Sequence, residues 1–564
     1  MEERAEEEKL DDARASLADA PGDRLRLRDA LRLEGKGATA CYWGSLAVLA
    51  VAIFVPRLLP CTDYPQHLGL ADIGRRLFDP AAPEHASFQL NLFTYNGLFH
   101  LLVAQLSRVL SIELAGRVVL ASSLVLLGGA SLALLRALGR PAGYAALMVP
   151  VIFSSSVGWG FVNYALGVAL MTCALVFVAR ALRRPSIACA IGAALLSLLC
   201  AATHVLATLL LCLFAASLAP ELALRATAAR GQTLLQNATR AAVRATIALC
   251  PLLVGAAFCI AVYRVQYAWS PGSYSDPTLE GSAPSLGKKL LHFCAWATGL
   301  HADHSDQLFV LAALVVVLVA WIASFRRGHG ETTRRDASVV LPFVVVTAAY
   351  LMTPMVIIGT HVIFPRLAQA VVLAAVVSAP RITGARARLA EIACLGLALF
   401  SSLNLLVHVA LYARETDDAS RVIDDLPAGR RATAVVYQPE TFAFRGRTLV
   451  HLAAYYGARK HADWAYSFAR FLSVPVRYTA TGAPGWPARG WEFGPQDYDA
   501  RCRYARTFDL VIVAAPPEVA EDASGEPAIR ARVFGDDRDA VRLLSHHGRF
   551  WAFDSAGLPA DGTP

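Results

Sequence analysis

The chain has 564 residues, of which 56% are hydrophobic and only 17% are charged, and its formal net charge is +8. Apolar runs of membrane-spanning length begin at Trp43 and recur to Tyr412, which excludes a soluble globular protein. The arginines are dispersed between these runs without interleaved aromatic residues, which argues against a nucleic-acid partner and is typical of basic loops beside anionic lipid. The sequence therefore predicts a polytopic α-helical membrane protein.

The first 39 residues form a polar tail. It is acidic up to Asp23 and then basic through five residues that end at Lys36. Positive charge directly before the first span predicts a cytoplasmic N-terminus, and the long charged prefix argues against a cleaved signal peptide. Residues 1–39 are therefore expected to be a cytoplasmic tail that precedes a transmembrane domain over residues 40–412.

A polar stretch, Cys61-Thr62-Asp63-Tyr64-Pro65-Gln66-His67-Leu68, follows the first apolar run at once. An ionisable group where a helix leaves the bilayer costs several kcal/mol unless it meets a partner or water. If a helix begins near Tyr64, Asp63 is its N-cap, which is the simple structural alternative. The imidazole of His67 and the amide of Gln66 lie within one turn, a combination that suits acid-base work on a hydroxyl. We expect Asp63 and His67 to be catalytic and Gln66 to bind substrate.

The predicted outer loop over residues 61–91 continues with apolar residues at helical spacing, which predicts interfacial helices lying on the outer leaflet. The next apolar stretch opens with Tyr95, Asn96 and His100, which are candidates to face Asp63 and bind substrate. A belt of interfacial aromatic residues with a packed histidine is the alternative interpretation.

Arginine clusters recur between the apolar runs. If each cluster is cytoplasmic, the intervening hairpins reach the outer face, and about eleven spans result by the length criterion. The segment Leu92–Leu110 does not fit this pattern, so it is either a partial helix or an exception to the charge rule. The clusters are Arg136 with Arg140, Arg180 to Arg184, Arg225 to Arg244, Arg326 to Arg335 and Arg381 to Arg388.

Two hairpins contribute further candidates. Ser154 to Tyr164 joins two apolar runs with small and amide side chains, including Asn163, which permits a close approach of the backbone. His204 lies at the turn of a helical hairpin, where a histidine is more often packed than reactive. We include Asn163 and His204 among the substrate-binding candidates.

A long outer loop over residues 264–306 ends with His301, Asp303, His304 and Asp306, which resemble metal ligands in type. Their spacing matches no metal motif, so a solvated helix start is the preferred interpretation. No metal site is predicted and no cofactor is firmly implied, although a divalent cation stays an open alternative.

His361 and Arg366 lie where a late span begins on the outer side. Arginine at a membrane boundary is costly unless it snorkels to the surface or meets an anion, and its planar fork matches phosphate oxygens. Both residues are therefore candidates to bind a phosphate group, and snorkelling is the alternative for Arg366.

After Tyr412 the composition becomes that of a soluble domain. Ala432–Tyr437 and Asp509–Ala514 are predicted to be buried strands, and Arg549–Phe553 a last strand, with helices over Thr448–Lys460 and Ala528–Ser545. Residues 413–564 are therefore expected to form a small α/β domain, of a size typical of one domain. The charge pattern places it outside the cell membrane, as an extracytoplasmic domain.

This order of features resembles the GT-C superfamily of polyprenyl-phosphate-dependent glycosyltransferases. The Asp-Tyr-Pro-Gln-His-Leu stretch and Gly160-Phe161-Val162-Asn163-Tyr164 are also similar to segments of uncharacterised bacterial membrane proteins related to it. The resemblance implies that Asp63 is the catalytic carboxylate and that Arg366 contacts lipid phosphate. Many relatives carry a second acidic residue, which here Asp72 or Glu84 would have to supply, so the identity of the base and the use of metal stay open.

The resemblance implies a multi-pass protein of the bacterial inner membrane that transfers a sugar from a polyprenyl-phosphate donor to a glycan, lipid or protein acceptor. Membrane lipid is the other expected partner. A polymerase or ligase of lipid-linked glycans shares this chemistry. A transporter or lipid-binding scaffold is the alternative from another class, although neither internal repeats nor paired Gly/Pro-broken spans are detectable.

Overall fold

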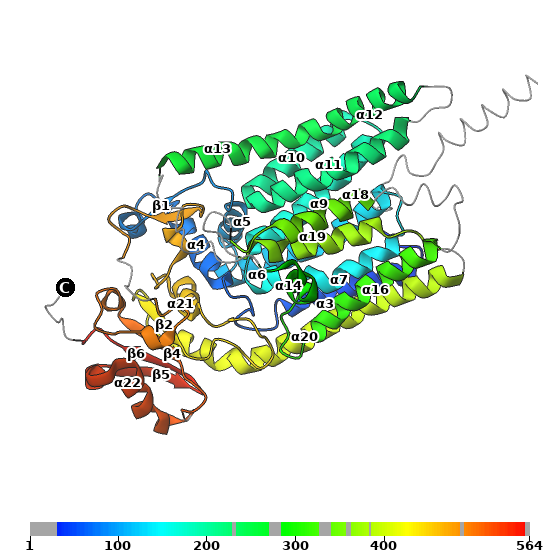
Figure 1. The fold of residues 1–564 in the computed structure, drawn as a ribbon. Coiled ribbons are helices and arrows are strands. Elements are labelled where there is room, and N and C mark those ends of the chain that lie inside the picture. Colours follow the sequence, from blue (N-terminus) through cyan, green and yellow to red (C-terminus); the bar gives the residue numbers. More distant parts are fainter. Residues whose placement is uncertain are drawn as a thin grey trace, which may run out of the picture.

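The computed structural model describes residues 31–227, 233–269, 284–325, 340–356, 362–382, 385–484, 490–519 and 521–558. Most of the predicted N-terminal tail, and the candidate His361, lie outside the described residues. Figure 1 shows a bundle of long helices with a smaller sheet-containing part at one end of it. The chain is therefore a polytopic helical protein with a small C-terminal α/β part, as the sequence predicted.

Six described helices are long and apolar enough to cross a membrane, and four shorter apolar helices accompany them, so the expected number of about eleven spans is not established. The bundle is built from α3 (Lys36–Ala52), α6 (Ile112–Ala137), α9 (Val162–Arg183), α10 (Ile187–Thr203), α11 (Val205–Thr227), α12 (Leu234–Leu249), α13 (Leu253–Trp269), α16 (Ser305–Phe325), α18 (Val340–Met352), α19 (Ile363–Ser378) and α20 (Ala385–Asp425).

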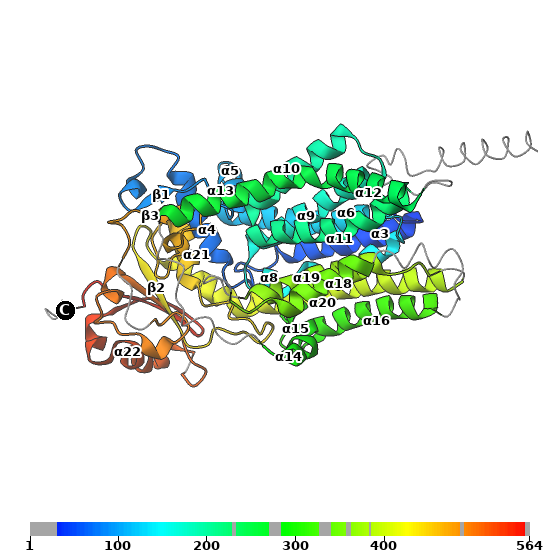
Figure 2. The same ribbon diagram turned by 45° about the horizontal axis from the view of Figure 1, so that its top comes forward.

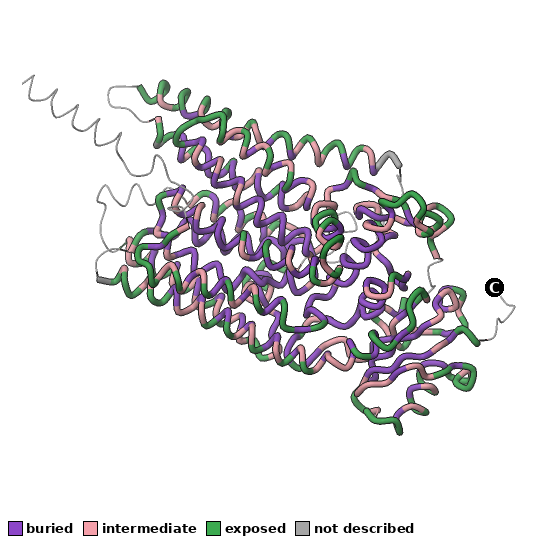
Figure 3. Tube along the Cα trace, turned by 180° about the vertical axis from the view of Figure 1, so that it is seen from behind, coloured by how far each residue is buried: buried purple, intermediate pink, exposed green. Residues whose placement is uncertain are grey.

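Burial separates central from peripheral helices. Every residue of α19 is buried, whereas α16 exposes Leu308, Leu311, Val315 and Leu318 along one face. Figure 3 shows the buried trace in the middle of the bundle and the exposed trace on its outer helices. An apolar helical stripe left exposed on a bundle of this kind faces lipid, so α16 lies at the membrane-facing surface and α19 in the interior.

Leu92–Leu110 forms only one short helix, α5 (Leu98–Leu106), after β1 (Phe88–Leu90). Nine residues of α-helix rise about 14 Å, less than half of the hydrocarbon core. The partial-helix alternative is therefore the one that the structure shows.

The first outer loop differs from the prediction of helices lying on the outer leaflet. It forms α4 (Tyr64–Arg76) and a short 3₁₀ turn, η1 (Pro83–Ala86), and every α4 residue from Tyr64 to Gly74 is buried. The reason is that α5, α6 and α21 (Leu452–Lys460) pack around α4. The polar residues of α4 therefore face protein, where they need hydrogen-bond partners.

The C-terminal part contains a four-stranded sheet in the order β2-β4-β6-β5. Its strands are β2 (Ala432–Val436), β4 (Leu510–Ala514), β5 (Arg542–His547) and β6 (Phe550–Asp554), with β2 and β4 parallel and the other pairs antiparallel. This confirms the three predicted strands.

The predicted helix Ala528–Ser545 is wrong beyond Phe534. The helix α22 spans Glu526–Phe534 and is followed by a 3₁₀ helix, η10 (Gly535–Ala540), whose first residue, Gly535, has φ 55°. The chain then enters β5. A left-handed residue after a helix ends it, and glycine takes that conformation without a steric penalty. The sequence signal for the end was therefore Gly535 itself.

Distant segments meet at the sheet end of the bundle, as the turned view in Figure 2 also shows. The strand β1 of the first outer loop pairs antiparallel with β3 (Val476–Tyr478), so that Phe88 lies opposite Tyr478. The loop before α16 pairs with the C-terminal part through His301 and Phe444. The helix α20 continues without a break past the predicted domain boundary at Tyr412 and packs against β5 and β6.

Candidate active site

The backbone at Asp63 is held by the hairpin that precedes α9. The amide of Thr62 donates to the carbonyl of Gly158 at 2.9 Å, and the amide of Asp63 donates to that of Trp159 at 3.0 Å. Gly160 has φ 84°, and a Cβ there would lie 2.5 Å from the amide nitrogens of Asp63 and Tyr64. Only glycine permits this contact, which confirms the predicted close approach of the backbone.

Asp63 directly precedes α4, but its side chain makes no capping hydrogen bond. Its Oδ1 instead lies 3.2 Å from Nε2 of His451, and 17% of the side chain is exposed. The capping alternative is therefore not realised by the carboxylate, which is left to face a partly open space beside a histidine.

His451 is oriented by Gln66. The amide Oε1 of Gln66 accepts N–H groups of Trp464 at 2.8 Å and Phe468 at 3.2 Å, so its Nε2 faces Nδ1 of His451 at 3.1 Å. An amide nitrogen only donates, so Nδ1 of His451 accepts. The proton of neutral His451 then lies on Nε2 and is donated to Asp63.

A second acidic residue, Glu492, lies on the other side of His451, with Oε1 3.4 Å from Nδ1. Burial raises the pKa of Glu492 to about 7, opposed by His451 and reinforced by Asp63. Burial alone would lower the pKa of His451, but the hydrogen bond to Asp63 and the charges of Glu492 and Asp63 raise it. The cluster thus contains a carboxyl group, that of Glu492, which titrates near neutral pH beside an imidazole whose pKa is raised.

Asp72 and Glu84, which would have to supply a second acid by the resemblance, both pair with basic side chains. Asp72 pairs with Arg75 at 2.9 Å and with His461 at 2.9 Å, and Glu84 pairs with Arg76. The second carboxyl group in contact with His451 is that of Glu492, from the C-terminal part.

His67 belongs to a chain of three groups. Nδ1 of His100 lies 2.9 Å from the carbonyl oxygen of Asn96, so it carries the proton, and Nε2 of His100 can then accept from Nδ1 of His67 at 3.0 Å. In this tautomer Nε2 of His67 is an acceptor, and no partner for it is found within the described ranges. Burial, with positive charge nearby, holds the pKa of His67 well below its usual range.

Arg366 lies inside the bundle rather than at its surface, with 6% of the residue exposed. Its guanidinium carbon lies 3.7 Å from the ring centroid of Phe161, and Nη1 lies 3.1 Å from Nε2 of His204. Its own carbonyl accepts the hydroxyl of Tyr164 at 2.6 Å. A buried cation held in this way is not a side chain that snorkels to a membrane surface.

The structure brings six of the predicted residues into one neighbourhood, because His67 interacts electrostatically with His100, His204 and Arg366, and Arg366 interacts with Asp63. Asn163 is buried next to Tyr164, and its Oδ1 lacks a partner among the described residues. Tyr95 is half-buried beside Asn96 at the start of α5. The six are Asp63, Gln66, His67, His100, His204 and Arg366.

A separate group of three side chains is able to hold a metal ion. It joins His301 and Asp303 to His408 of α20, with ligand atoms within 4.8 Å of one another. The two imidazole rings stack at 3.8 Å with planes 10° apart, so one ion cannot lie in the plane of both rings unless they turn. The predicted helix start is present, because α16 begins at Ser305.

No family model matches the chain, and no curated protein matches it in sequence. Among solved structures it is similar to ArnT from Cupriavidus metallidurans bound to undecaprenyl phosphate, with a TM-score of 0.50 and 11% identity, covering 94% of this chain and 100% of that chain. The apo state of ArnT gives a TM-score of 0.46 and 12% identity, covering 92% and 98%. ArnT is a GT-C glycosyltransferase, so the first likeness shows that this chain has a GT-C fold, as the sequence resemblance predicted.

Proposed function

We propose that this protein is a membrane glycosyltransferase that moves a sugar from a polyprenyl-phosphate donor to an acceptor hydroxyl. The observation that carries the proposal is the position of Asp63, a partly exposed carboxylate held by His451 and close to the buried cation of Arg366. The GT-C fold supports it, as does the polyprenyl phosphate bound to the structurally similar ArnT.

In the proposed reaction, Asp63 accepts the proton of the acceptor hydroxyl while that oxygen forms a bond to the anomeric carbon of the sugar. The bond from this carbon to the phosphate oxygen breaks, and the polyprenyl phosphate leaves with the bonding electrons. His451 occupies Oδ1 of Asp63, so Oδ2 is left to receive the proton. Arg366 stabilises the negative charge on the departing phosphate, which is the larger contribution in a buried site.

His67 is the second candidate for the base, because its Nε2 is an acceptor in the tautomer set by His100 and Asn96. Its low pKa keeps it neutral at pH 7, but the same shift disfavours the imidazolium that proton transfer would form, so His67 would be a weak base. The variants Asp63→Asn and His67→Gln therefore distinguish the two candidates, because replacement of the true base should cause the larger loss of activity.

The proposed acceptor is a glycan, lipid or protein at the outer face of a bacterial inner membrane. Both outer loops and the C-terminal part lie at the same end of the bundle, which supports a single extracytoplasmic side for donor, acceptor and Asp63. We assign the N-terminal tail to the cytoplasm from its basic residues.

Purified full-length protein tests the proposal when it is incubated with polyprenyl-phosphate sugars and the released polyprenyl phosphate is measured. Asp63→Asn keeps the shape of the side chain but removes the base, and we expect turnover to fall roughly a hundredfold or more. Asp79→Asn is the matched control, because Asp79 lies exposed in the same loop and its side chain accepts the amide of Ala81, a contact that asparagine can also make. If the Asp63→Asn protein is fully active and the His67→Gln protein is inactive, His67 is the base. Full activity in both variants would overturn the enzyme proposal.

A further inference from the structure

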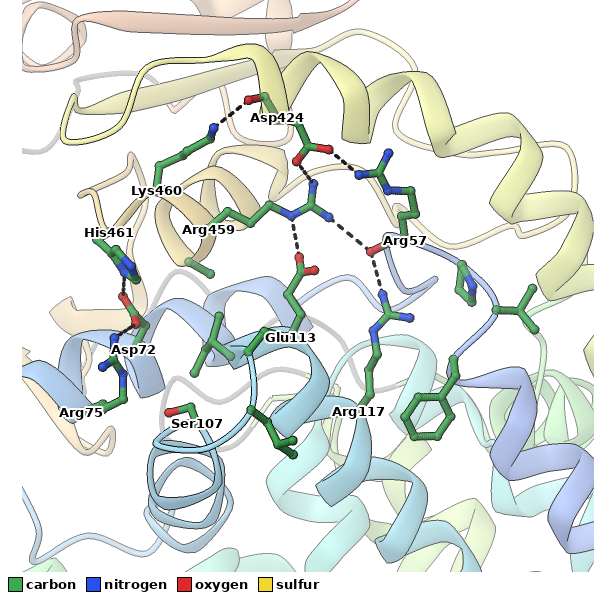
Figure 4. A pocket seen from close by; sticks show the side chains of 17 residues that line it. Arg57, Asp72, Arg75, Ser107, Glu113, Arg117, Asp424, Arg459, Lys460 and His461 are labelled. Carbon is green, nitrogen blue, oxygen red and sulfur yellow. Dashed lines mark hydrogen bonds and ion pairs between the residues drawn. The ribbon is translucent and has the colours of Figure 1, made fainter.

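A cavity of about 710 Å³ lies where the bundle meets the C-terminal part, away from Asp63. Its walls come from the turn after α3, the last turns of α4 and α21, the start of α6 and the C-terminal end of α20, as Figure 4 shows in close view. No residue of the active-site neighbourhood lines it. It is therefore a second space with its own chemistry.

The lining of this cavity is rich in charge. Five cationic side chains line it, namely Arg57, Arg75, Arg117, Arg459 and Lys460. Three carboxylates, those of Asp72, Glu113 and Asp424, line it as well, so five positive charges face three negative ones and a surplus of two remains with His461 neutral. A surplus of like charge in a partly enclosed space favours an anionic occupant.

The carboxylates are already engaged. Arg459 bonds to Glu113 at 2.7 Å and to Asp424 at 3.0 Å, and Arg57 also pairs with Asp424. Asp72 is shared between Arg75, Arg76 and His461. These contacts hold Arg57, Arg75 and Arg459 in place, because each of these three guanidinium groups has a carboxylate on one side.

Among the described residues, two of the cations find only backbone oxygens as partners. The guanidinium of Arg117, 8% exposed, donates to the carbonyls of Ile53 at 3.2 Å and Arg57 at 2.7 Å. Lys460 donates to the carbonyl of Asp424 at 2.7 Å. Neither lies within ion-pair distance of a carboxylate in the part of the chain that the structure describes. A nearly buried arginine without a counter-ion is costly, and a bound anion would remove that cost.

Part of the lining of the cavity is apolar. Phe54 and Val55, directly after α3, are 42% and 40% exposed, and Leu110 and Ile112 lie half-buried at the start of α6. These residues lie at the ends of apolar helices, where a bilayer surface would meet the protein. A ligand with an anionic head and an apolar tail fits both parts of the lining at once.

We infer that this cavity binds the headgroup of an anionic phospholipid, with the phosphate against Arg117, Arg75 and Lys460 and the acyl chains along Phe54 and Val55. Arginine and lysine recognise phosphate oxygens through charge-assisted hydrogen bonds, and basic pockets beside membrane helices bind anionic headgroups. A lipid bound here contacts the first outer loop, the bundle and α21 together, so it stabilises the docking of the C-terminal part.

Native mass spectrometry of the detergent-solubilised full-length protein tests the inference without any turnover. The protein is titrated with dioctanoyl phosphatidylglycerol and, as the matched zwitterionic lipid, dioctanoyl phosphatidylcholine. We expect one phosphatidylglycerol molecule to bind at least tenfold more tightly than phosphatidylcholine, because two surplus charges each contribute roughly fivefold in affinity. Equal binding of the two lipids would overturn the inference.

Substitutions of the lining residues test whether the lipid binds in this cavity. Lys460→Gln and Arg75→Gln should each weaken phosphatidylglycerol binding by roughly fivefold, and Arg117→Gln should do so at least as strongly if it folds. Arg108→Gln is the matched control, because Arg108 is exposed just after α5 at the same end of the bundle and does not line the cavity. Unchanged binding in Lys460→Gln and Arg75→Gln refutes the site. Inorganic phosphate that binds as tightly as the lipid would show that the ligand is a soluble anion instead.

Discussion

At the scale of single residues, the cluster of Asp63, His451 and Glu492 holds more carboxyl groups than cations. Two carboxylates that share one imidazole cannot all be ionised without repulsion, so one of them stays protonated more readily. Burial selects Glu492 for this role, because it raises the pKa of that carboxyl to about 7, whereas Asp63 is hydrogen-bonded by Nε2–H of His451. The result is a carboxyl group, that of Glu492, which titrates near neutrality beside the hydrogen-bonded pair of Asp63 and His451.

This arrangement predicts a pH-dependent stability. The pKa of Glu492 rises from an ordinary value of 4.5 to about 7 on folding, so the unfolded chain loses this proton at lower pH than the folded protein. Stability should therefore fall as pH rises from about 4.5 to about 7. The raised pKa of His451 acts in the same direction, because its contribution is lost as pH rises through its folded pKa.

Thermal unfolding in detergent, measured between pH 5 and pH 8, checks this prediction. Glu492→Gln resembles the protonated carboxyl at every pH, so the variant should become progressively more stable than the natural protein as pH rises toward 8. Asp497→Asn in the same segment is the control, because Asp497 lies outside this cluster. Parallel melting curves for the natural protein and Glu492→Gln across the range would contradict the raised pKa.

Six of the candidate site residues could be found from the sequence because polar groups beside apolar runs are rare and costly. His451 and Glu492 could not, since they lie in a soluble-like segment where charged residues are common. They reach Asp63 only because α21 packs on α4 and β3 pairs with β1. The sequence around His451 or Glu492 contains no signal that predicts the packing of α21 on α4 or the pairing of β3 with β1.

At the scale of elements, α19 explains how a cation is kept inside the bundle. The helix is buried on all sides, and Val362 directly before it has φ 58°, a left-handed conformation that a β-branched residue rarely adopts. The carbonyl of Val362 accepts Nε of Arg366 at 3.1 Å. Backbone strain at this turn thus accompanies the fixed orientation of the guanidinium.

Arg366→Lys tests whether that orientation matters. Lysine keeps the charge but has no planar fork, so it loses the stacking on Phe161 and a bidentate phosphate contact. We expect turnover to fall roughly tenfold or more, since one hydrogen bond to a charged group contributes ~1.5–3 kcal/mol. Arg108→Lys, at an exposed position, should leave activity unchanged. Equal turnover of Arg366→Lys and the natural protein would refute the phosphate role.

Helices with long continuous apolar runs were predictable, whereas features set by tertiary contacts were not. The sequence predicted α6 and α9 because their apolar runs are long enough to span a bilayer. The sequence predicted a lipid-facing environment for α4, because a helix of mixed polarity is typical of a membrane interface. In the structure α4 is instead buried against α21. Polarity alone does not distinguish a headgroup layer from a polar protein interface.

At the scale of the whole molecule, the catalytic candidates come from both ends of the chain. Asp63 follows α3, whereas His451 and Glu492 belong to the C-terminal part. The two-stranded sheet of β1 and β3 joins the first outer loop to the C-terminal part. The continuous helix α20 carries the chain from the bundle into that part, so the change in composition after Tyr412 coincides with no break in structure. The change in composition marks the point at which the chain leaves the lipid, and here that point lies within the helix α20.

This assembly makes a definite prediction for topology. The helix α3 has 17 residues and rises about 25 Å, so Gly37 at its start and Asp63 beyond its end lie at opposite ends of it. The C-terminal part contacts Asp63 directly, so it must share the face of Asp63 and not that of Gly37. Because basic residues precede α3, we expect Gly37 to be cytoplasmic and the C-terminal part to be extracytoplasmic.

Single cysteines at Gly37 and Thr481 test this in intact cells with a membrane-impermeant maleimide. Both positions are exposed, and a Cβ at Gly37 meets no neighbour within 4 Å, whereas one at Gly482 would collide with Ser87. We expect Thr481→Cys to be labelled in intact cells and Gly37→Cys only after the membrane is opened. The unsubstituted protein measures the background from native thiols such as the exposed Cys250. Labelling of both positions from the same side would contradict the topology, because α3 alone separates Gly37 from a site that the C-terminal part must reach.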